Sequence, residues 1–110
     1  MAKHNLCLYF MDKFIPIDIP LNKVLELAES KPLELFELIR NIIEDEVGQI
    51  YDVEIYGRYF DPENMDIVIE YFIKCSLGEV SLKIIYSKDP AEALNKYYDY
   101  EKHVRVNSKY

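Results

Sequence analysis

The feature that most constrains the fold is a long run of alternating apolar residues between Met65 and Tyr86, interrupted once by a turn. Alternation places successive side chains on opposite faces of a β-strand. Leu77-Gly78 reads as a two-residue hairpin turn, and pairing Ser76 with Glu79 gives an unbroken apolar ladder. We therefore predict two antiparallel strands in a register that a slip of one residue would ruin. The face that the ladder buries carries Met65, Ile67, Ile69, Tyr71, Ile73 and Cys75.

Two other segments have the same alternation. Residues 6–11 and 15–19 flank Asp12-Lys13 and predict a hairpin in which Met11 lies opposite Phe14. Its second strand is expected at a sheet edge, because Pro16 lacks a ladder donor. Residues 50–59 predict a further strand, which ends before turn residues 61–64. Pairing Tyr59 with Met65 would set Glu54 opposite Glu70. In this strand we expect Tyr51, Val53, Ile55 and Tyr59 on one face, and Asp52, Glu54, Tyr56 and Arg58 on the other.

Helical spacing of apolar residues appears in three places. The first helix begins near Pro20, and the second runs from Ser30, a candidate N-cap, to Gly48, where a left-handed C-terminal residue is wanted. Asp89-Pro90 predicts the start of a third helix that ends near residue 102. The final residues, about 103–110, are expected to fray or to form a short strand.

These elements predict an α+β fold in the order β-β-α-α-β-β-β-α. The economical arrangement is a two-layer sandwich, a mainly antiparallel sheet of about five strands with helices on one face. A chain of 110 residues and 13.1 kDa has the size of one domain, so residues 1–110 are taken as a single domain.

Composition excludes several classes of function. A formal net charge of -7 argues against a general binder of phosphate backbones, and no apolar stretch is long enough to span a membrane. We find no signal peptide, so a cytoplasmic location is expected, the host cytoplasm if the protein is viral. The scarcity of amide side chains is loosely typical of thermophile proteins.

Sites for cofactors and metals are not expected. There is no phosphate-binding loop, dinucleotide fingerprint or nucleophile elbow, and His4 and His103 lack zinc-ligand spacing. Cys7 and Cys75 fall on opposite faces of the predicted sheet, which argues against a disulfide. Without a catalytic constellation we do not expect an enzyme.

One arrangement of acids suggests a metal-dependent hydrolase, our third hypothesis. Asp61, Asp66 and Glu70 lie near one strand, with Lys74 four residues after Glu70. Metal nucleases with an Asp…Glu-x-Lys core need an acid and a lysine two positions apart, whereas a spacing of four separates them by about 13 Å. Solvated strand faces with cross-strand ion pairs, such as Arg58–Asp66, are the simpler interpretation.

The outer face of the predicted sheet is more informative. It carries Tyr56, Val68, Phe72 and Ile85 beside Glu54 and Glu70. Aromatic residues mixed with uncompensated acids are typical of a partner-binding surface. The alternative is that the C-terminal helix or a second subunit covers this face.

The leading hypothesis is a non-enzymatic interaction protein that binds and inhibits a basic partner, as nuclease inhibitors, immunity proteins and viral antagonists of host defence do. Its contact residues would be Glu54, Tyr56, Glu70 and Phe72, with Glu37, Glu44 and Asp45 of the second helix as steering acids. The alternative is a nucleic-acid-associated homodimer that binds through its tail. That tail interleaves basic and aromatic residues, namely Lys96, Tyr97, Tyr98, Tyr100, Lys102, His103, Arg105 and Lys109.

Overall fold

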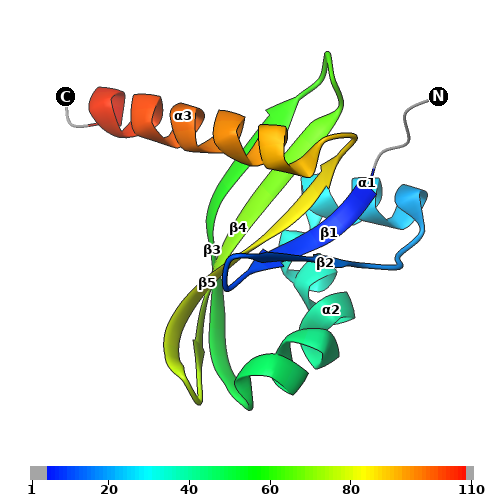
Figure 1. Cartoon of the computed structure of the whole chain (residues 1–110), viewed down its shortest axis with the longest axis vertical. Helices are drawn as coiled ribbons and strands as arrows, with labels where there is room; N and C mark the ends of the chain where they lie inside the picture. Colours follow the sequence, from blue (N-terminus) through cyan, green and yellow to red (C-terminus); the bar gives the residue numbers. More distant parts are fainter. Residues whose placement is uncertain (1–4, 109–110) are drawn as a thin grey trace.

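Five antiparallel strands form one sheet in the order β2-β1-β5-β4-β3 (Figure 1). The computed structural model describes residues 5–108, and the side chains of residues 5–99. The predicted α+β class, element order and number of strands are confirmed. The strands are β1 (Asn5–Phe10), β2 (Lys13–Pro16), β3 (Ile50–Asp61), β4 (Asp66–Cys75) and β5 (Gly78–Ser87), and the helices are α1 (Leu21–Ser30), α2 (Pro32–Val47) and α3 (Pro90–Ser108).

The main core lies between one face of the sheet and the helices α1 and α2. The alternating residues of β4 and β5 point into it, among them Ile69, Tyr71 and Ile73, and meet the apolar stripe of α2. Phe36 of α2 contacts Tyr71, with 5.3 Å between the ring centroids. The Tyr71 hydroxyl donates to the Pro32 carbonyl at 2.7 Å, so the buried phenol keeps a partner. The apolar face assigned to β4 is therefore confirmed.

The helix α3 lies on the other face, which differs from the expectation of helices on one side only (Figure 1). Three of its residues, Ala93, Leu94 and Tyr97, pack in a second, smaller cluster with residues of the sheet. The reason is that the outer face has apolar residues of its own near the beginning of β4, and these need a cover. The sheet residues in this cluster are Cys7, Val68 and Ile85.

Both tight hairpins have the predicted faces but differ from the predicted register by two residues. In the first, Tyr9 lies opposite Phe14, and the turn is Met11-Asp12, with φ of 51° and 62°. Positive φ at both central residues is what a type I′ hairpin turn requires. In the second, Cys75 lies opposite Gly78, so Ser76-Leu77 forms the turn. A shift of two preserves which side chains face the core, so alternation alone cannot distinguish the two registers.

A β-bulge in β3 changes the predicted faces of that strand. Ile55 pairs with Tyr71 and Gly57 with Glu70, so Tyr56 is an extra residue without a partner position. Beyond the bulge the alternation is inverted. Arg58 therefore faces α1, where its Nη1 donates to the Glu29 carbonyl at 3.3 Å, and not the outer face with Asp66. Tyr59 packs on the α3 side, and Glu54 lies opposite Phe72 instead of Glu70.

Two of the three predicted helix caps are confirmed. Gly48 ends α2 with a positive φ of 80°, although its ψ of -154° differs from the predicted left-handed helical conformation, and the Asp89 carboxylate accepts the Glu92 N–H at 3.2 Å. Ser30 is not the N-cap of α2: it is the last residue of α1 and donates its hydroxyl to the Glu26 carbonyl at 2.9 Å. Lys31 holds the cap position instead.

The C-terminal helix is longer than predicted. α3 continues to Ser108, so residues 103–108, expected to fray or form a strand, are helical. Its C-terminal part extends past the β3 edge of the sheet (Figure 1). His4 and Lys109, named in the predictions, lie outside the described residues.

Candidate functional site

The part of the outer face that α3 does not cover carries an aromatic and acidic surface. We call it the open sheet patch and define it as Glu54, Tyr56 and Phe72. Glu54 and Phe72 lie directly opposite each other on β3 and β4, and the rings of Tyr56 and Phe72 are 5.9 Å apart. Tyr56 is 55% exposed although it is a large aromatic residue. The structure thus brings together three of the four residues predicted to contact a partner.

Glu70, the fourth, is buried beneath α3 at 8% exposure. Its carboxylate accepts hydrogen bonds from the hydroxyls of Ser81 and Tyr97 and lies 3.3 Å from the ammonium of Lys83, which is 5% exposed. Burial by itself would raise the pKa of Glu70, but the two hydroxyls and the ammonium outweigh it and lower the pKa below the ordinary value. Glu70 is therefore a buried, charged residue that binds groups within the protein, and it is not available to contact a partner.

Two tyrosine rings complete the surroundings of Lys83. The ammonium lies 5.9 Å from the centre of the Tyr9 ring and 5.3 Å from that of Tyr98. A cation between aromatic faces and a carboxylate is well compensated for the loss of water. Sequence reasoning allowed that the C-terminal helix covers this face, which the structure shows for the part around Glu70, but did not predict the polar cluster beneath the helix. The available signal was that Glu70, Ser81 and Lys83 share one face with the apolar residues Val68 and Ile85.

Gly57 allows α3 to approach this cluster. A Cβ atom at Gly57 would lie 2.8 Å from the Tyr97 hydroxyl oxygen, closer than real contacts allow. The same hydroxyl donates to Glu70 at 2.5 Å. Gly57, the residue after the bulge, therefore leaves the space that Tyr97 of α3 occupies over β3.

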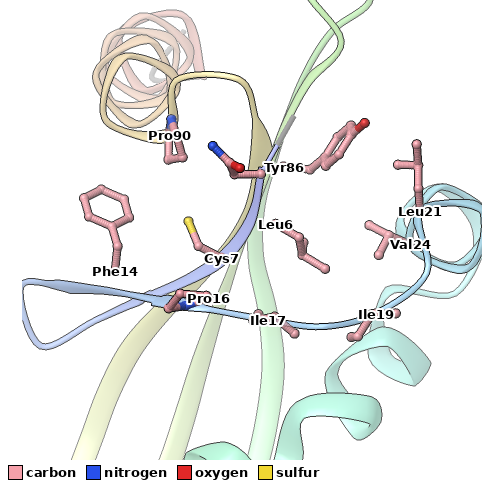
Figure 2. Close-up of a pocket in the computed structure, with 11 residues that line it drawn as sticks. Leu6, Cys7, Phe14, Pro16, Ile17, Ile19, Leu21, Val24, Tyr86 and Pro90 are labelled. Carbon is pink, nitrogen blue, oxygen red and sulfur yellow. The ribbon is translucent and has the colours of Figure 1, made fainter. Parts of the chain in front are cut away.

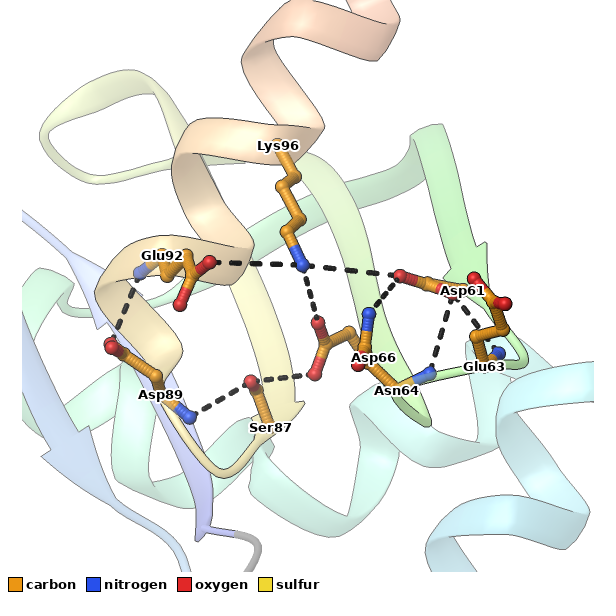
Figure 3. A network of polar contacts seen from close by, with 8 residues as sticks. All are labelled: Asp61, Glu63, Asn64, Asp66, Ser87, Asp89, Glu92 and Lys96. Carbon is orange, nitrogen blue, oxygen red and sulfur yellow. Dashed lines mark hydrogen bonds and ion pairs between the residues drawn. The ribbon is translucent and has the colours of Figure 1, made fainter.

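A second polar cluster fastens the beginning of α3 to the turn between β3 and β4 (Figure 3). The ammonium of Lys96 lies between Asp61, Asp66 and Glu92, at 4.0, 3.6 and 3.9 Å. Ser87 donates to Asp66 at 2.7 Å and accepts the Asp89 N–H at 3.0 Å. Lys96 thus occupies the position between the carboxylates that a metal ion would need.

Asp61 also shapes the turn itself. Its carboxylate accepts the Asn64 side-chain amide at 2.8 Å and the Glu63 N–H at 3.0 Å. These hydrogen bonds, Asn64 first, lower the pKa of Asp61 although burial opposes them. Among residues 5–99, whose side chains are described, no group of three or more His, Cys, Asp or Glu residues is arranged to hold a metal ion.

The predicted steering acids lie on the opposite side of the sheet. Glu37 and Glu44 flank Arg40 on α2, with N–O distances of 3.0 and 4.0 Å, and Asp45 is exposed beside them. Because α2 covers the other face, these acids do not border the open sheet patch. The predicted contact residues and steering acids therefore form two separate surfaces.

Of the predicted nucleic-acid tail, only the side chains of Lys96, Tyr97 and Tyr98 lie within the described residues, and each contacts the rest of the fold, although Tyr98 is 47% exposed. Lys96 is held by acids, Tyr97 is buried, and Tyr98 covers Lys83.

A hollow of about 470 Å³ lies at the sheet edge where β2 ends (Figure 2). Its lining comes from both sides of β1, since Leu6 faces the main core and Cys7 the α3 cluster. The strand therefore divides it, and it does not form one enclosed pocket. Burial raises the pKa of Cys7 to about 11, which keeps the thiol protonated and a poor nucleophile. Cys7 and Cys75 are both free and lie on opposite faces, as predicted.

In the part of the chain that the structure describes, no helix combines the length and apolar character required to cross a bilayer. Comparison with known protein families, curated proteins and solved structures finds no significant match. The functional argument therefore rests on the geometry of these surfaces.

Proposed function

We propose that the protein is a non-enzymatic interaction protein that binds and inhibits a basic macromolecular partner through the open sheet patch. The observation that carries the proposal is the ring pair of the exposed Tyr56 and the half-buried Phe72, with Glu54 beside it, on a part of the sheet that α3 leaves open. Aromatic residues that lose their water at the centre of an interface supply much of the binding free energy.

The chemistry of the patch favours a cationic partner. An Arg or Lys side chain laid over the Tyr56 ring gains a cation–π contact and reaches a carboxylate at Glu54. Two further exposed acids, Asp52 and Glu79, lie on the same outer face, on either side of Lys74. The net charge of -7 accelerates the encounter with a positively charged surface.

The same clusters argue against the two other hypotheses. Use of Lys96 or Tyr97 to bind nucleic acid would have to release Lys96 from Asp66 and Asp61 or expose Tyr97. A metal-dependent hydrolase built on Asp61 and Asp66 would need to displace the same lysine. Neither requirement applies to the open sheet patch, whose rings are already accessible.

The test compares three baits in an extract of the native host. The wild type is compared with a patch variant, Tyr56→Ser with Phe72→Ser, and with a matched variant on the opposite face, Glu37→Lys with Asp45→Lys. We expect a basic protein to be retained by the wild type and the helix variant and lost by the patch variant. Retention of no basic protein, or loss only with the helix variant, would overturn the proposal.

Kinetics with the captured partner then separate the two surfaces. Truncating Tyr56 or Phe72 should accelerate dissociation at any salt concentration, because the anchors act in the bound state. Reversing Glu37 and Asp45 should only slow association at low salt, an effect that fades as the Debye length approaches about 3 Å at 1 M. Faster dissociation of the helix variant at high salt would place the contact on α2 instead.

A further inference from the structure

A second hollow lies on the other side of the sheet from the open sheet patch. It measures about 710 Å³ and opens between α1 and the hairpin of β3 and β4. That volume falls in the range of small-molecule sites. Its lining includes Leu25, Ala28, Phe60, Met65, Ile67 and Ile69, and it reaches Tyr59, which packs on the α3 side of the β3 edge.

The hollow exists because α1 is short compared with the hairpin that it covers. Ile67 and Ile69 form the floor and are almost fully buried, while Phe60 and Met65 remain 58% and 38% exposed. Phe60 lies opposite Ile67 and belongs to the face that packs on helices elsewhere in the sheet, while Met65 lies in the turn before β4. The apolar face therefore continues beyond the helix into an open groove.

One cation, the exposed Arg58, lines this apolar groove, and the bulge at Tyr56 places it there. Without the inverted alternation Arg58 would point to the outer face with the strand acids. Its guanidinium makes one hydrogen bond, from Nη1 to the Glu29 carbonyl at 3.3 Å, and among the described residues it pairs with no carboxylate. A guanidinium has five N–H donors in a planar fork, so it retains a free edge for a carboxylate.

Glu29 is the one acid in the lining, and it is exposed. Its backbone carbonyl, and not its carboxylate, accepts the hydrogen bond from Arg58. The carboxylate stays hydrated, and its screened repulsion weakens the binding of any anion nearby. Removing the charge of Glu29 should therefore raise the affinity for an anion, whereas removing Arg58 should lower it.

We propose that this groove binds a small amphipathic anion, an aliphatic chain with a single carboxylate. The carboxylate would pair with the free edge of the Arg58 guanidinium, and the chain would lie along Phe60, Ile67 and Ile69. The charge complementarity is local: a net charge of -7 repels anions in general, so an unpaired guanidinium within an apolar lining selects an anion that brings its own apolar surface.

Isothermal titration calorimetry with three probes of similar chain length tests the proposal. We expect decanoate to bind at one site, decanol at least about tenfold more weakly, and decyltrimethylammonium not at all. Equal affinity for decanoate and decanol would mean that the groove is only an apolar surface. That result, or the absence of decanoate binding below its micelle-forming concentration, overturns the proposal.

Variants localise the site. Arg58→Gln should weaken decanoate binding about tenfold or more. Phe60→Ser should also weaken it, and because Phe60 is exposed the protein should stay folded. Glu29→Gln should strengthen it. Lys74→Gln, a change of equal charge on the outer face, should have no effect, and neither should Tyr56→Ser with Phe72→Ser. Equal loss in Arg58→Gln and Lys74→Gln would reduce the effect to net charge and contradict the assignment, whatever the outcome for the basic partner.

Discussion

At the scale of single residues, the contact between Gly57 and Tyr97 determines how closely α3 approaches the sheet. The tyrosine hydroxyl reaches the Glu70 carboxylate only because position 57 lacks a Cβ atom. Glu70 in turn balances Lys83, which is buried with it. Three elements of the fold, β3, β4 and α3, therefore depend on one small polar cluster.

Replacing Gly57 with Ala should destabilise the protein by about 1–3 kcal/mol, the usual cost of overpacking. The same change in a Tyr97→Phe background should cost less, because the oxygen that the new methyl group meets is gone. Urea unfolding of the four proteins in the double-mutant cycle measures the coupling, which we expect to exceed about 0.5 kcal/mol. Additive effects would show that the methyl group is accommodated elsewhere.

The Glu70 cluster should also make stability depend on pH. Because the folded protein lowers the pKa of Glu70, the stabilisation is complete above the ordinary value of 4.5 and is lost as the pH falls through the lower folded value. At pH 7 Glu70→Gln should cost about 3 kcal/mol, since Lys83 is left buried without its counter-charge. The two proteins should converge in urea unfolding as the pH falls below 4.5 and through the lower folded value, whereas a constant difference would contradict the assignment.

At the scale of elements, the three helices are attached in different ways. α1 and α2 share an extensive apolar core with the sheet, whereas α3 contributes three residues to a small cluster and depends on Lys96 and Tyr97 for polar contacts. Elements with few buried apolar contacts open at lower free energy. α3 should therefore be the first part of the fold to detach.

Lys96→Met should accelerate amide hydrogen exchange in the first turns of α3 while leaving β4 and β5 unchanged. The ammonium of Lys96 links α3 to Asp66 and Asp61, and the variant removes both of these ion pairs. Lys74→Met, at an exposed position on the same sheet face, serves as the control. Uniform acceleration over the sheet would mean that α3 and the main core open together.

The strands show what the sequence pattern can and cannot determine. Alternation identified the apolar face of β4 correctly, because it is a property of one strand. It left both hairpin registers uncertain by two residues, because Leu8 packs on the same face whether it meets Ile15 or Ile17. The bulge at Tyr56 was not predicted, although Gly57 beside it was a signal, because an isolated glycine in a strand often marks a bulge. Its cause is tertiary: Tyr59 has a second cluster to join.

At the scale of the whole molecule, the sheet separates two surfaces of different chemistry. On the outer side are the open sheet patch and α3, and on the other are α2 with its acids and the groove that contains Arg58. Sequence reasoning placed the aromatic residues and the acids correctly on strands and helix. It combined Glu37, Glu44 and Asp45 with the patch because the side on which each helix packs depends on connections that single-strand patterns do not encode.

Self-association should depend on salt. α3 covers Val68 and Ile85, so Tyr56 and Phe72 remain as the apolar centre of a face that also carries acids. Two copies that each carry a charge of -7 repel at low ionic strength, and screening removes that repulsion. Light scattering should show a monomer at low salt and weak association near 1 M that Phe72→Lys abolishes. A dimer at low salt would require a contact elsewhere on the molecule.

The two cysteines allow the opening of each layer of the protein to be measured separately. Cys7 lies beneath α3 and Cys75 within the main core, and both thiols are free and buried. An alkylating reagent can reach each sulfur only when the layer above it opens, so its rate of labelling reports that opening. Mass spectrometry should find Cys7 modified well before Cys75. Lys96→Met should shorten the labelling time of Cys7 and leave that of Cys75 unchanged. Simultaneous labelling would mean that the two layers come apart in a single event.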